Sequence, residues 1–302
     1  MKNLHELVKW ARNKDRFRTV NDYANFCREY LSFVNTENVI QATIVAQNEP
    51  VYHFYQYKED GNYSITRPLN SDLLLSESEF DQAEQTVLSA LPDIKSIKAD
   101  HEARMTLNKF VYTCQQAIGA TLDALPARKS NIARKINGDL FERFIRRILN
   151  DIGVTTDHGF ESVPVMLNGE KQFNMKYEHD LIVKNGDNIQ AIGSVKTSSK
   201  DRIDKIFIDK FLYNKLTDQL DMPHFAVFLN DVQRANTKNQ QIQRVSGTFL
   251  TGHFKGYTIK LNPLDGVYYC DLRPVMRTDK ILRQNIGTLD NLLVTDIWEF
   301  VS

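Results

Sequence analysis

The sequence lacks any long apolar run, and none of its hydrophobic stretches approaches the 18 residues that a membrane-spanning helix needs. Residues 1–16 carry charges where a secretory signal would have an apolar segment, so we expect neither a leader nor a membrane partner. Cysteine is scarce: Cys27, Cys114 and Cys270 are odd in number and lie far apart. We therefore expect reduced thiols, a cytoplasmic location, and neither a disulfide framework nor a structural zinc site.

Several chemical signatures are missing as well. The sequence has no GxSxG motif, no phosphate-binding glycine loop, and no spacing of histidine and cysteine typical of metal ligands. Its net charge is zero, from 38 basic and 38 acidic residues, whereas nucleic-acid-binding proteins are usually basic. The basic residues are nevertheless unevenly distributed, with seven lysines and arginines but only two acidic residues from Arg128 to Arg147. A neutral chain can thus carry a local basic surface.

The first part of the chain is expected to be mainly helical. Helical spacing of apolar residues covers three of its segments, which are 1–35, 76–91 and 100–125. Residues 39–69 alternate apolar and polar side chains around Glu59–Asn62, and this pattern predicts a β-hairpin. We expect 1–125 to form a mixed, largely helical region whose role the sequence does not indicate, followed by a second domain over 126–302.

The second part alternates between helices and strands. The predicted helices are 130–153 and 201–220, and the predicted strands are 159–167, 178–183, 188–195 and 224–232. The pair Asn185–Gly186 between two alternating runs is the strongest hairpin signal in the chain, and a further hairpin is predicted over 256–272. This order of elements predicts an α/β domain in which helices flank a mixed β-sheet.

The hairpin around Asn185–Gly186 carries an acid and a lysine at its open end. Strict alternation places Asp180 on one face of its strand and His179 on the other. If the turn is centred on Asn185–Gly186, the side chains of Asp180 and Lys196 face each other across two paired strands. A carboxylate can bind a hard divalent cation such as Mg²⁺, and a neighbouring lysine can orient the water that attacks a phosphodiester. The pair therefore indicates phosphodiester hydrolysis, although such a pair is commonly just a surface salt bridge.

Two further carboxylates are candidates for completing a metal site. Glu142 lies in the predicted helix before the strands, and Asp209 lies 13 residues after Lys196 in the helix that follows it. Each has an ordinary alternative role: Glu142 has Arg146 at the i+4 position, where the two would form a helical ion pair. The order of helix acid, strand acid, hairpin and strand lysine favours a common site.

The segment 130–232 resembles the catalytic core of the PD-(D/E)xK nucleases. Its motif Ser-Val-Lys-Thr-Ser-Ser-Lys-Asp-Arg, 194–202, is similar to one subgroup, the type II restriction endonucleases reading CCGG, CCNGG or CCWGG sites. That subgroup often has a small residue where Ser194 stands and takes a carboxylate from the next helix instead. This sequence departs from the pattern at His179, where the family has proline, and at Asp209, where it usually has glutamate.

The subgroup also has hydroxyl residues after the lysine and then an (R/K)-(D/E)-R triplet. Here the corresponding residues are Ser198, Ser199, Lys200, Asp201 and Arg202. Arginine can donate two hydrogen bonds to guanine, and aspartate can accept one from cytosine, so such a triplet can read G·C pairs in the major groove. Without the preceding motif, the same residues would be read as a solvated helix start.

The resemblance implies a Mg²⁺-dependent, type II site-specific endonuclease that cleaves double-stranded DNA at a short palindromic site. Asp180, Asp209 and Glu142 would hold the metal, and Lys196 would complete the catalytic set. A palindromic site implies a homodimer or larger homo-oligomer, and a cognate DNA methyltransferase is implied functionally but not as a bound partner. The alternatives are a structure-specific repair or recombination nuclease, an inactive DNA-binding regulator, and an α/β protein in which the motifs are coincidental.

Overall fold

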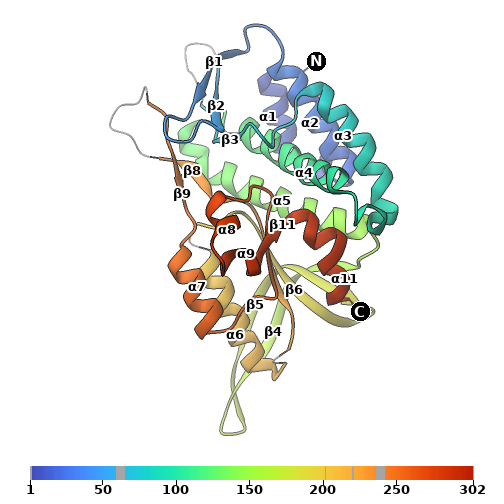
Figure 1. The fold of residues 1–302 in the computed structure, drawn as a ribbon. Helices are drawn as coiled ribbons and strands as arrows, with labels where there is room; N and C mark the ends of the chain where they lie inside the picture. The colour runs from blue at the N-terminus through green and yellow to red at the C-terminus, as the bar shows by residue number, and fades with distance from the viewer. Residues whose placement is uncertain (1, 59–64, 201, 220, 236–241, 302) are drawn as a thin grey trace. The chain divides into compact units, whose positions relative to one another are not determined.

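The computed structural model describes residues 2–58, 65–200, 202–219, 221–235 and 242–301. The chain divides into two compact units, drawn as ribbons in Figure 1. Unit 1 contains Met1–Arg147 and Asp231–Thr248, and unit 2 contains Ile148–Asn230 and Phe249–Ser302. The boundary after Arg147 differs from the boundary after residue 125 that the sequence suggests. The division into domains at residue 125 stays a prediction. Within the described ranges, no helix is sufficiently long and apolar to cross a membrane.

Unit 1 is built mainly from helices, in agreement with the pattern of its sequence. Its α-helices are α1 Leu4–Ala11, α2 Val20–Val34, α3 Glu77–Ala90, α4 His101–Leu122 and the first part of α5 Ser130–Asp151, with 3₁₀ turns at Lys14–Arg16, Leu91–Ile97 and Ala127–Lys129. Helices α1, α2 and α3 begin with capping boxes on Asn3, Thr19 and Ser76, each of which accepts a hydrogen bond from the third helical amide. Local capping therefore fixes where these helices start.

The described part of unit 1 also contains five short strands. They form a sheet of β1 Ile40–Val45, β2 Tyr52–Tyr57 and β3 Leu69–Asn70, and a separate pair of β8 Val232–Arg234 and β9 Val245–Gly247. Strands β1 and β2 are antiparallel and connect through 46–51. The predicted turn Glu59–Asn62 lies outside the described residues, but Gln56 and Ile65, on either side of 57–64, form an antiparallel bridge.

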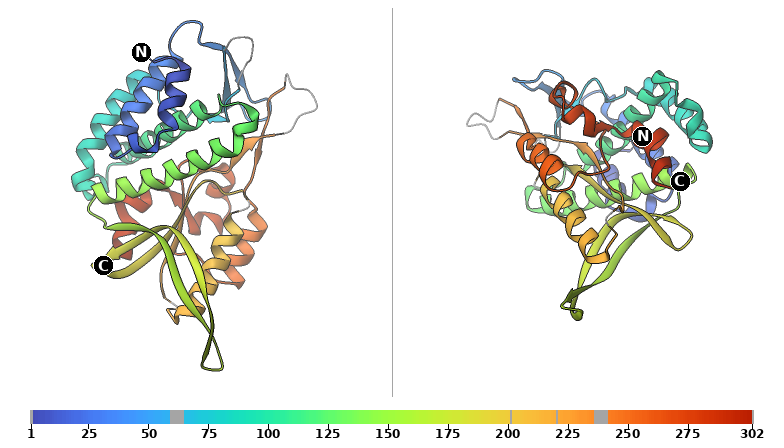
Figure 2. Two further views of the ribbon diagram at one scale, coloured as in Figure 1. Left: turned by 180° about the vertical axis from the view of Figure 1, so that it is seen from behind. Right: turned by 60° about the horizontal axis from the view of Figure 1, so that its bottom comes forward.

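Unit 2 is organised around one mixed sheet of six strands. Its order is β11-β10-β7-β6-β5-β4, with bounds Ile286–Thr288, Gly266–Tyr269, His224–Asn230, Asn188–Ser198, Glu170–Asn185 and Thr156–Leu167. Strands β4, β5 and β6 form an antiparallel meander, whereas β6, β7, β10 and β11 run parallel. Every residue of β7 is buried, as expected for a strand in the middle of a sheet that is covered on both faces. Strands β4 and β5 form a long hairpin that extends beyond the rest of the sheet (Figures 1 and 2).

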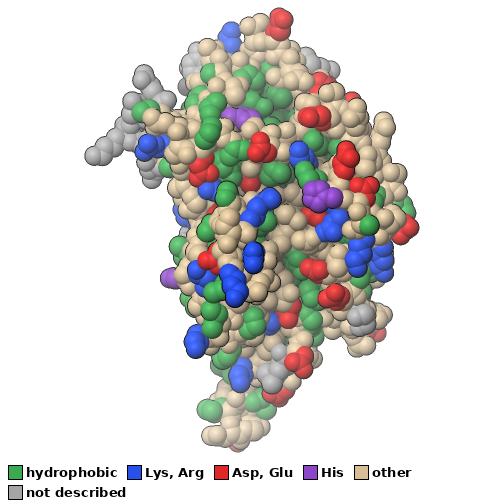
Figure 3. Space-filling model, viewed as in Figure 1, with side chains coloured by type: hydrophobic (Ala, Val, Ile, Leu, Met, Phe, Trp, Pro, Cys, Tyr) green, Lys and Arg blue, Asp and Glu red, His purple; other side chains and the backbone are tan. Residues whose placement is uncertain are grey.

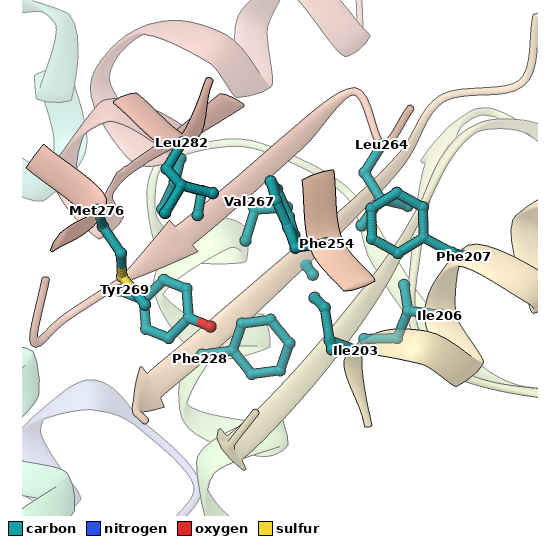
Figure 4. Packing of buried hydrophobic residues seen from close by; sticks show 12 residues of the cluster. Ile203, Ile206, Phe207, Phe228, Phe254, Leu264, Val267, Tyr269, Met276 and Leu282 are labelled. Carbon is teal, nitrogen blue, oxygen red and sulfur yellow. The ribbon is translucent and has the colours of Figure 1, made fainter. Parts of the chain in front are cut away.

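Helices cover this sheet and bury its apolar side chains. They are α6 Ile203–Thr217, α7 Thr251–Lys260, α8 Pro274–Thr278, α9 Leu282–Asn285, α10 Leu289–Asn291, the π-helical turn Leu292–Asp296 and α11 Ile297–Phe300. Figure 4 shows the core beneath α6 to α9, a cluster in which Phe207 of α6 and Met276 of α8 are buried together with Phe228 of β7 and Tyr269 of β10. Burying each such side chain stabilises the fold by about 2 kcal/mol.

Two hairpin assignments from the sequence need correction. The hairpin predicted over 256–272 is wrong, because 256–260 ends helix α7 and β10 forms only parallel pairs, with β7 and β11. Conversely, β4 and β5 are not two separate short strands but the arms of one hairpin. Its turn is Asn168–Gly169, whose φ angles of 52° and 82° are those that an Asn-Gly turn adopts.

Candidate active site

The candidate site lies where strands β5 and β6 separate. Their turn is tight, with Asn185 paired to Asn188 and Gly186 at φ 59°. The described ladder runs back to the pair Leu181–Gly193 and ends there. A Cβ atom at Gly193 would lie 2.7 Å from the Phe225 ring, so this close packing of β6 against its neighbours requires glycine. Beyond this pair the backbone groups of the two strands no longer bond to each other.

Just beyond the last pair of the ladder, the side chain of Asp180 connects β5 to β6. Its Oδ2 accepts a hydrogen bond from the backbone N–H of Val195 at 3.0 Å. The same oxygen lies 2.6 Å from Nζ of Lys196, and the two side chains are 14% and 29% exposed. The contact predicted from the hairpin is therefore present, while the catalytic roles of the two residues stay predictions. A carboxylate held by two donors has a fixed orientation and remains accessible to a small ligand.

The register of the sheet shows which face carries the lysine. Lys196 is the parallel partner of Phe228 in β7, and paired residues of neighbouring strands point to the same face. Phe228 packs in the core beneath α6 to α9. Lys196 therefore projects on the face of the sheet that these helices cover, at the carboxyl end of β6.

A bulge in β5 changes the alternation that the sequence predicts. Between two pairs of the β4–β5 ladder, β4 contributes only His158 whereas β5 contributes both Asp180 and Leu181. The prediction that His179 points away from the Asp180 face is consequently wrong. Its ring lies 5.6 Å from that of Tyr213 in α6, at an interplanar angle of 85°, on the same side of the sheet as Lys196. The extra residue thus brings His179 and the acid–lysine pair to one face.

His179 belongs to a small polar cluster that the sequence did not reveal. Its Nε2 atom lies 3.5 Å from Oε2 of Glu161 in β4, and the Tyr213 hydroxyl donates a hydrogen bond of 2.8 Å to the same oxygen. Burial lowers the pKa of His179, while the carboxylates of Glu161, Asp180 and Asp209 oppose this change. No sequence motif marks Glu161 in strand β4. It comes near His179 only because β4 pairs with β5.

Asp209 lies on the part of α6 that faces this cluster. It forms an ion pair with Lys205 one turn earlier, and its side chain is 37% exposed. Its charge acts on His179, and together with burial, which is the larger cause, it raises the pKa of Tyr177 to about 12. The carboxylate is therefore in electrostatic range of the residue next to Asp180.

Glu142 belongs to helix α5 in unit 1, where its charge raises the pKa of Arg146 against the larger, opposite effect of burial. Its predicted place in a metal site stays a prediction. Across the described residues, no three histidine, cysteine or carboxylate side chains gather closely enough to form a metal-binding group. The carboxylates of Asp180 and Asp209 supply the oxygen ligands that Mg²⁺ prefers, and Mg²⁺ usually keeps several waters besides. The chemistry of these two carboxylates suits a partly hydrated Mg²⁺, and the binding of that ion stays a prediction.

The residues predicted to read DNA follow Lys196 at the end of β6. Ser198 ends the strand, and its hydroxyl accepts a hydrogen bond from the Lys200 amide at 3.2 Å. Ser199 is only 1% exposed and its carbonyl accepts from the Arg202 amide, so it is placed to fix the loop. Lys200 and Arg202 are exposed, whereas Asp201 lies outside the described residues.

The likeness of this chain to known proteins lies in its structure rather than in its sequence. No protein-family model matches the sequence, and no curated protein matches it. The structure is similar to the crystal structure of the type IIP restriction endonuclease Kpn2I, with a TM-score of 0.70 and 17% sequence identity. The likeness covers 98% of this chain and 97% of that one. The chain therefore has the fold of a restriction endonuclease, which confirms the fold class predicted from its sequence.

Proposed function

We propose that this protein is a metal-dependent type II restriction endonuclease. It would hydrolyse double-stranded DNA at a short palindromic site of the CC/GG type. The observation that carries the proposal is the 2.6 Å contact between Asp180 and Lys196 at the open end of the β5–β6 hairpin. A fold shared with a type IIP restriction endonuclease along nearly the whole chain supports it.

The proposed cofactor is Mg²⁺, held by Asp180 and Asp209, with Glu142 as a further candidate ligand. When bound, such an ion polarises the phosphoryl group and lowers the pKa of a coordinated water. Asp180 is suited to the role of the main ligand because the Val195 amide fixes its Oδ2 at 3.0 Å. A carboxylate fixed in advance loses little conformational freedom when it binds a cation.

The protein groups have separable tasks in this proposal. Lys196 would orient the attacking water and offset the negative charge that builds up on the phosphate. Its ammonium is a compact charge on a side chain 29% exposed, so it can contact both Asp180 and a substrate. The hydrogen bond from Val195 keeps the acid in place during the reaction.

Recognition is assigned to the segment after Lys196. Lys200 and Arg202 are exposed at the carboxyl end of β6, four and six residues beyond the catalytic lysine. Lys200 and Arg202 would donate hydrogen bonds to guanine, and Asp201 would accept one from cytosine. Ser198 and Ser199 would hold this segment in place. Because a palindrome repeats the same half-site on both strands, two copies of the chain would act together.

Digestion of a plasmid of known sequence in the presence of Mg²⁺ tests the proposal. Discrete fragments with constant end sequences are expected, and those ends identify the site. Fragments of random length would favour a structure-specific repair or recombination nuclease, and DNA binding in Ca²⁺ without cleavage in Mg²⁺ would favour an inactive regulator. Protection of the plasmid by methylation within the identified site would connect the enzyme with a cognate methyltransferase.

A further inference from the structure

The short helices α8 and α9 follow directly from a strand aligned with the catalytic lysine. Lys196 pairs with Phe228, and Phe228 pairs with Tyr269 of β10, so the three residues form one row across parallel strands. With about 4.8 Å between strands, Tyr269 lies roughly 10 Å from Lys196 in this row. The chain then leaves the same carboxyl edge of the sheet and enters α8 at Pro274.

Two buried side chains determine which residues of this segment face outward. Met276 and Leu282 have no exposed surface and pack onto Val267 and Tyr269, as Figure 4 shows. Their sequence neighbours Arg277 and Arg283 are exposed, as is Lys280 between them. Figure 3 shows Lys and Arg side chains lying over α8 and α9. We call Arg277, Lys280 and Arg283 the α8–α9 basic surface.

The charges of this surface are not neutralised within the described part of the protein. Asp279, an acidic residue between Arg277 and Lys280 in the sequence, forms an ion pair of 2.8 Å with Lys255 of α7. Arg277, Lys280 and Arg283 form no ion pair with any described carboxylate. The twelve residues from Pro274 to Asn285 therefore carry three cations that form no ion pair with a described carboxylate, although the net charge of the chain is zero.

We propose that the α8–α9 basic surface binds the phosphate backbone of double-stranded DNA beside the cleavage site, an inference that rests on the proposed function. Duplex DNA presents one negative charge per about 1.7 Å along its axis, and neutralising phosphates releases condensed counterions. The separation of roughly 10 Å between Lys196 and Tyr269 corresponds to about three nucleotides of one strand, at about 3.4 Å each. Arg277 and Arg283 can each hold a phosphate through two hydrogen bonds. The surface contributes affinity without reading sequence.

The test is the salt dependence of DNA binding by the full chain. Fluorescence anisotropy follows binding to a short duplex of arbitrary sequence, with Ca²⁺ replacing Mg²⁺, across a series of KCl concentrations. Each lost phosphate contact reduces the slope of log Kobs against log[KCl] by about 0.9. The triple variant Arg277→Gln/Lys280→Gln/Arg283→Gln should therefore show a slope smaller by roughly 2 to 3.

Matched variants separate this effect from a general change of charge. Lys58→Gln/Lys95→Gln/Lys98→Gln removes three exposed charges from unit 1 and should leave the slope unchanged. Arg277→Lys/Arg283→Lys keeps the charge and should retain the wild-type slope. If wild type binds and cleaves DNA but the triple glutamine variant keeps its slope, this inference is overturned while the proposed function stands. If wild type binds no DNA at any salt concentration, both fail.

Discussion

Replacing Lys196 with alanine tests whether this lysine takes part in catalysis or only forms an ordinary ion pair with Asp180. Its ammonium lies 2.6 Å from Asp180, and its side chain is 29% exposed. A partly exposed pair contributes about 1 kcal/mol or less to stability, and Asp180 keeps the Val195 hydrogen bond. We therefore expect the unfolding midpoint to fall by about 2–4 °C at most. The cleavage rate should fall about 10²–10³-fold, because losing one group that offsets transition-state charge costs about 3–4 kcal/mol.

The chain offers a closely matched control for this experiment. Lys184 of β5 forms an ion pair with Asp157 of β4 at the same distance, 2.6 Å, and its side chain is also 29% exposed. Lys184→Ala should change stability by a similar amount and leave single-turnover cleavage of a plasmid near the wild-type rate. Anisotropy in Ca²⁺ should show that the Lys196 variant still binds DNA. Equal cleavage rates for the two alanine variants would refute the catalytic assignment.

Three further predictions concern the stability of unit 2. Burial lowers the pKa of His224 to about 4, so the unfolded state binds more protons between about pH 4 and pH 6.5. The free energy of unfolding, measured with urea, should accordingly fall by up to roughly 3 kcal/mol as the pH drops through that window. A His224→Phe variant whose free energy of unfolding falls equally over the same pH range would contradict this reasoning. Gly193→Ala places its Cβ atom 2.7 Å from the Phe225 ring and should cost about 1–3 kcal/mol in the same assay at pH 7. Asp265→Ala leaves the ammonium of Lys210, only 5% exposed, without its carboxylate and should cost about 3–5 kcal/mol, whereas a loss below about 1 kcal/mol would show that the charge is solvated instead.

The acid–lysine contact could be predicted because it depends on local signals. The Asn185–Gly186 pair marks the hairpin, but it does not fix the register of β5 and β6 by itself. Asn185 pairs with Asn188, so the turn is Gly186–Asp187, and the ladder shifts by one residue between Val183 and Lys184. The identity of the next helix followed from its apolar spacing. Short-range pattern therefore predicted that these two strands pair and which residues lie at their open end, whereas the exact register depends on the bulge.

The polar cluster around His179 could not be predicted in the same way. It requires the bulge at Asp180 and the pairing of Glu161 with Tyr177, both of which depend on how β4 aligns with β5. The turn at Asn168–Gly169 did carry a signal for that hairpin, but the bulge has no mark in the sequence. A single inserted residue reverses the alternation, and its cause lies in the neighbouring strand.

The hairpin predicted over 256–272 failed for a related reason. Tyr257 and Ile259 alternate with polar residues as in a strand, yet they lie in helix α7. The strand that follows, Gly266–Tyr269, pairs with β7, which lies far back in the sequence. Such long-range parallel pairing has no turn signal, because the partner strands are not neighbours along the chain.

Unit 2 is interrupted in sequence by Asp231–Thr248, which belongs to unit 1 and carries β8 and β9. Polypeptide therefore passes between the two units three times: after Arg147, after Asn230 and after Thr248. A single proteolytic nick between units cannot release either one, and deleting everything before residue 148 would leave β8 and β9 without Val51, Tyr52 and Phe54, beside which they are buried. Mutations that weaken the packing of β1 and β2 are thus expected to reduce the yield of folded unit 2 as well.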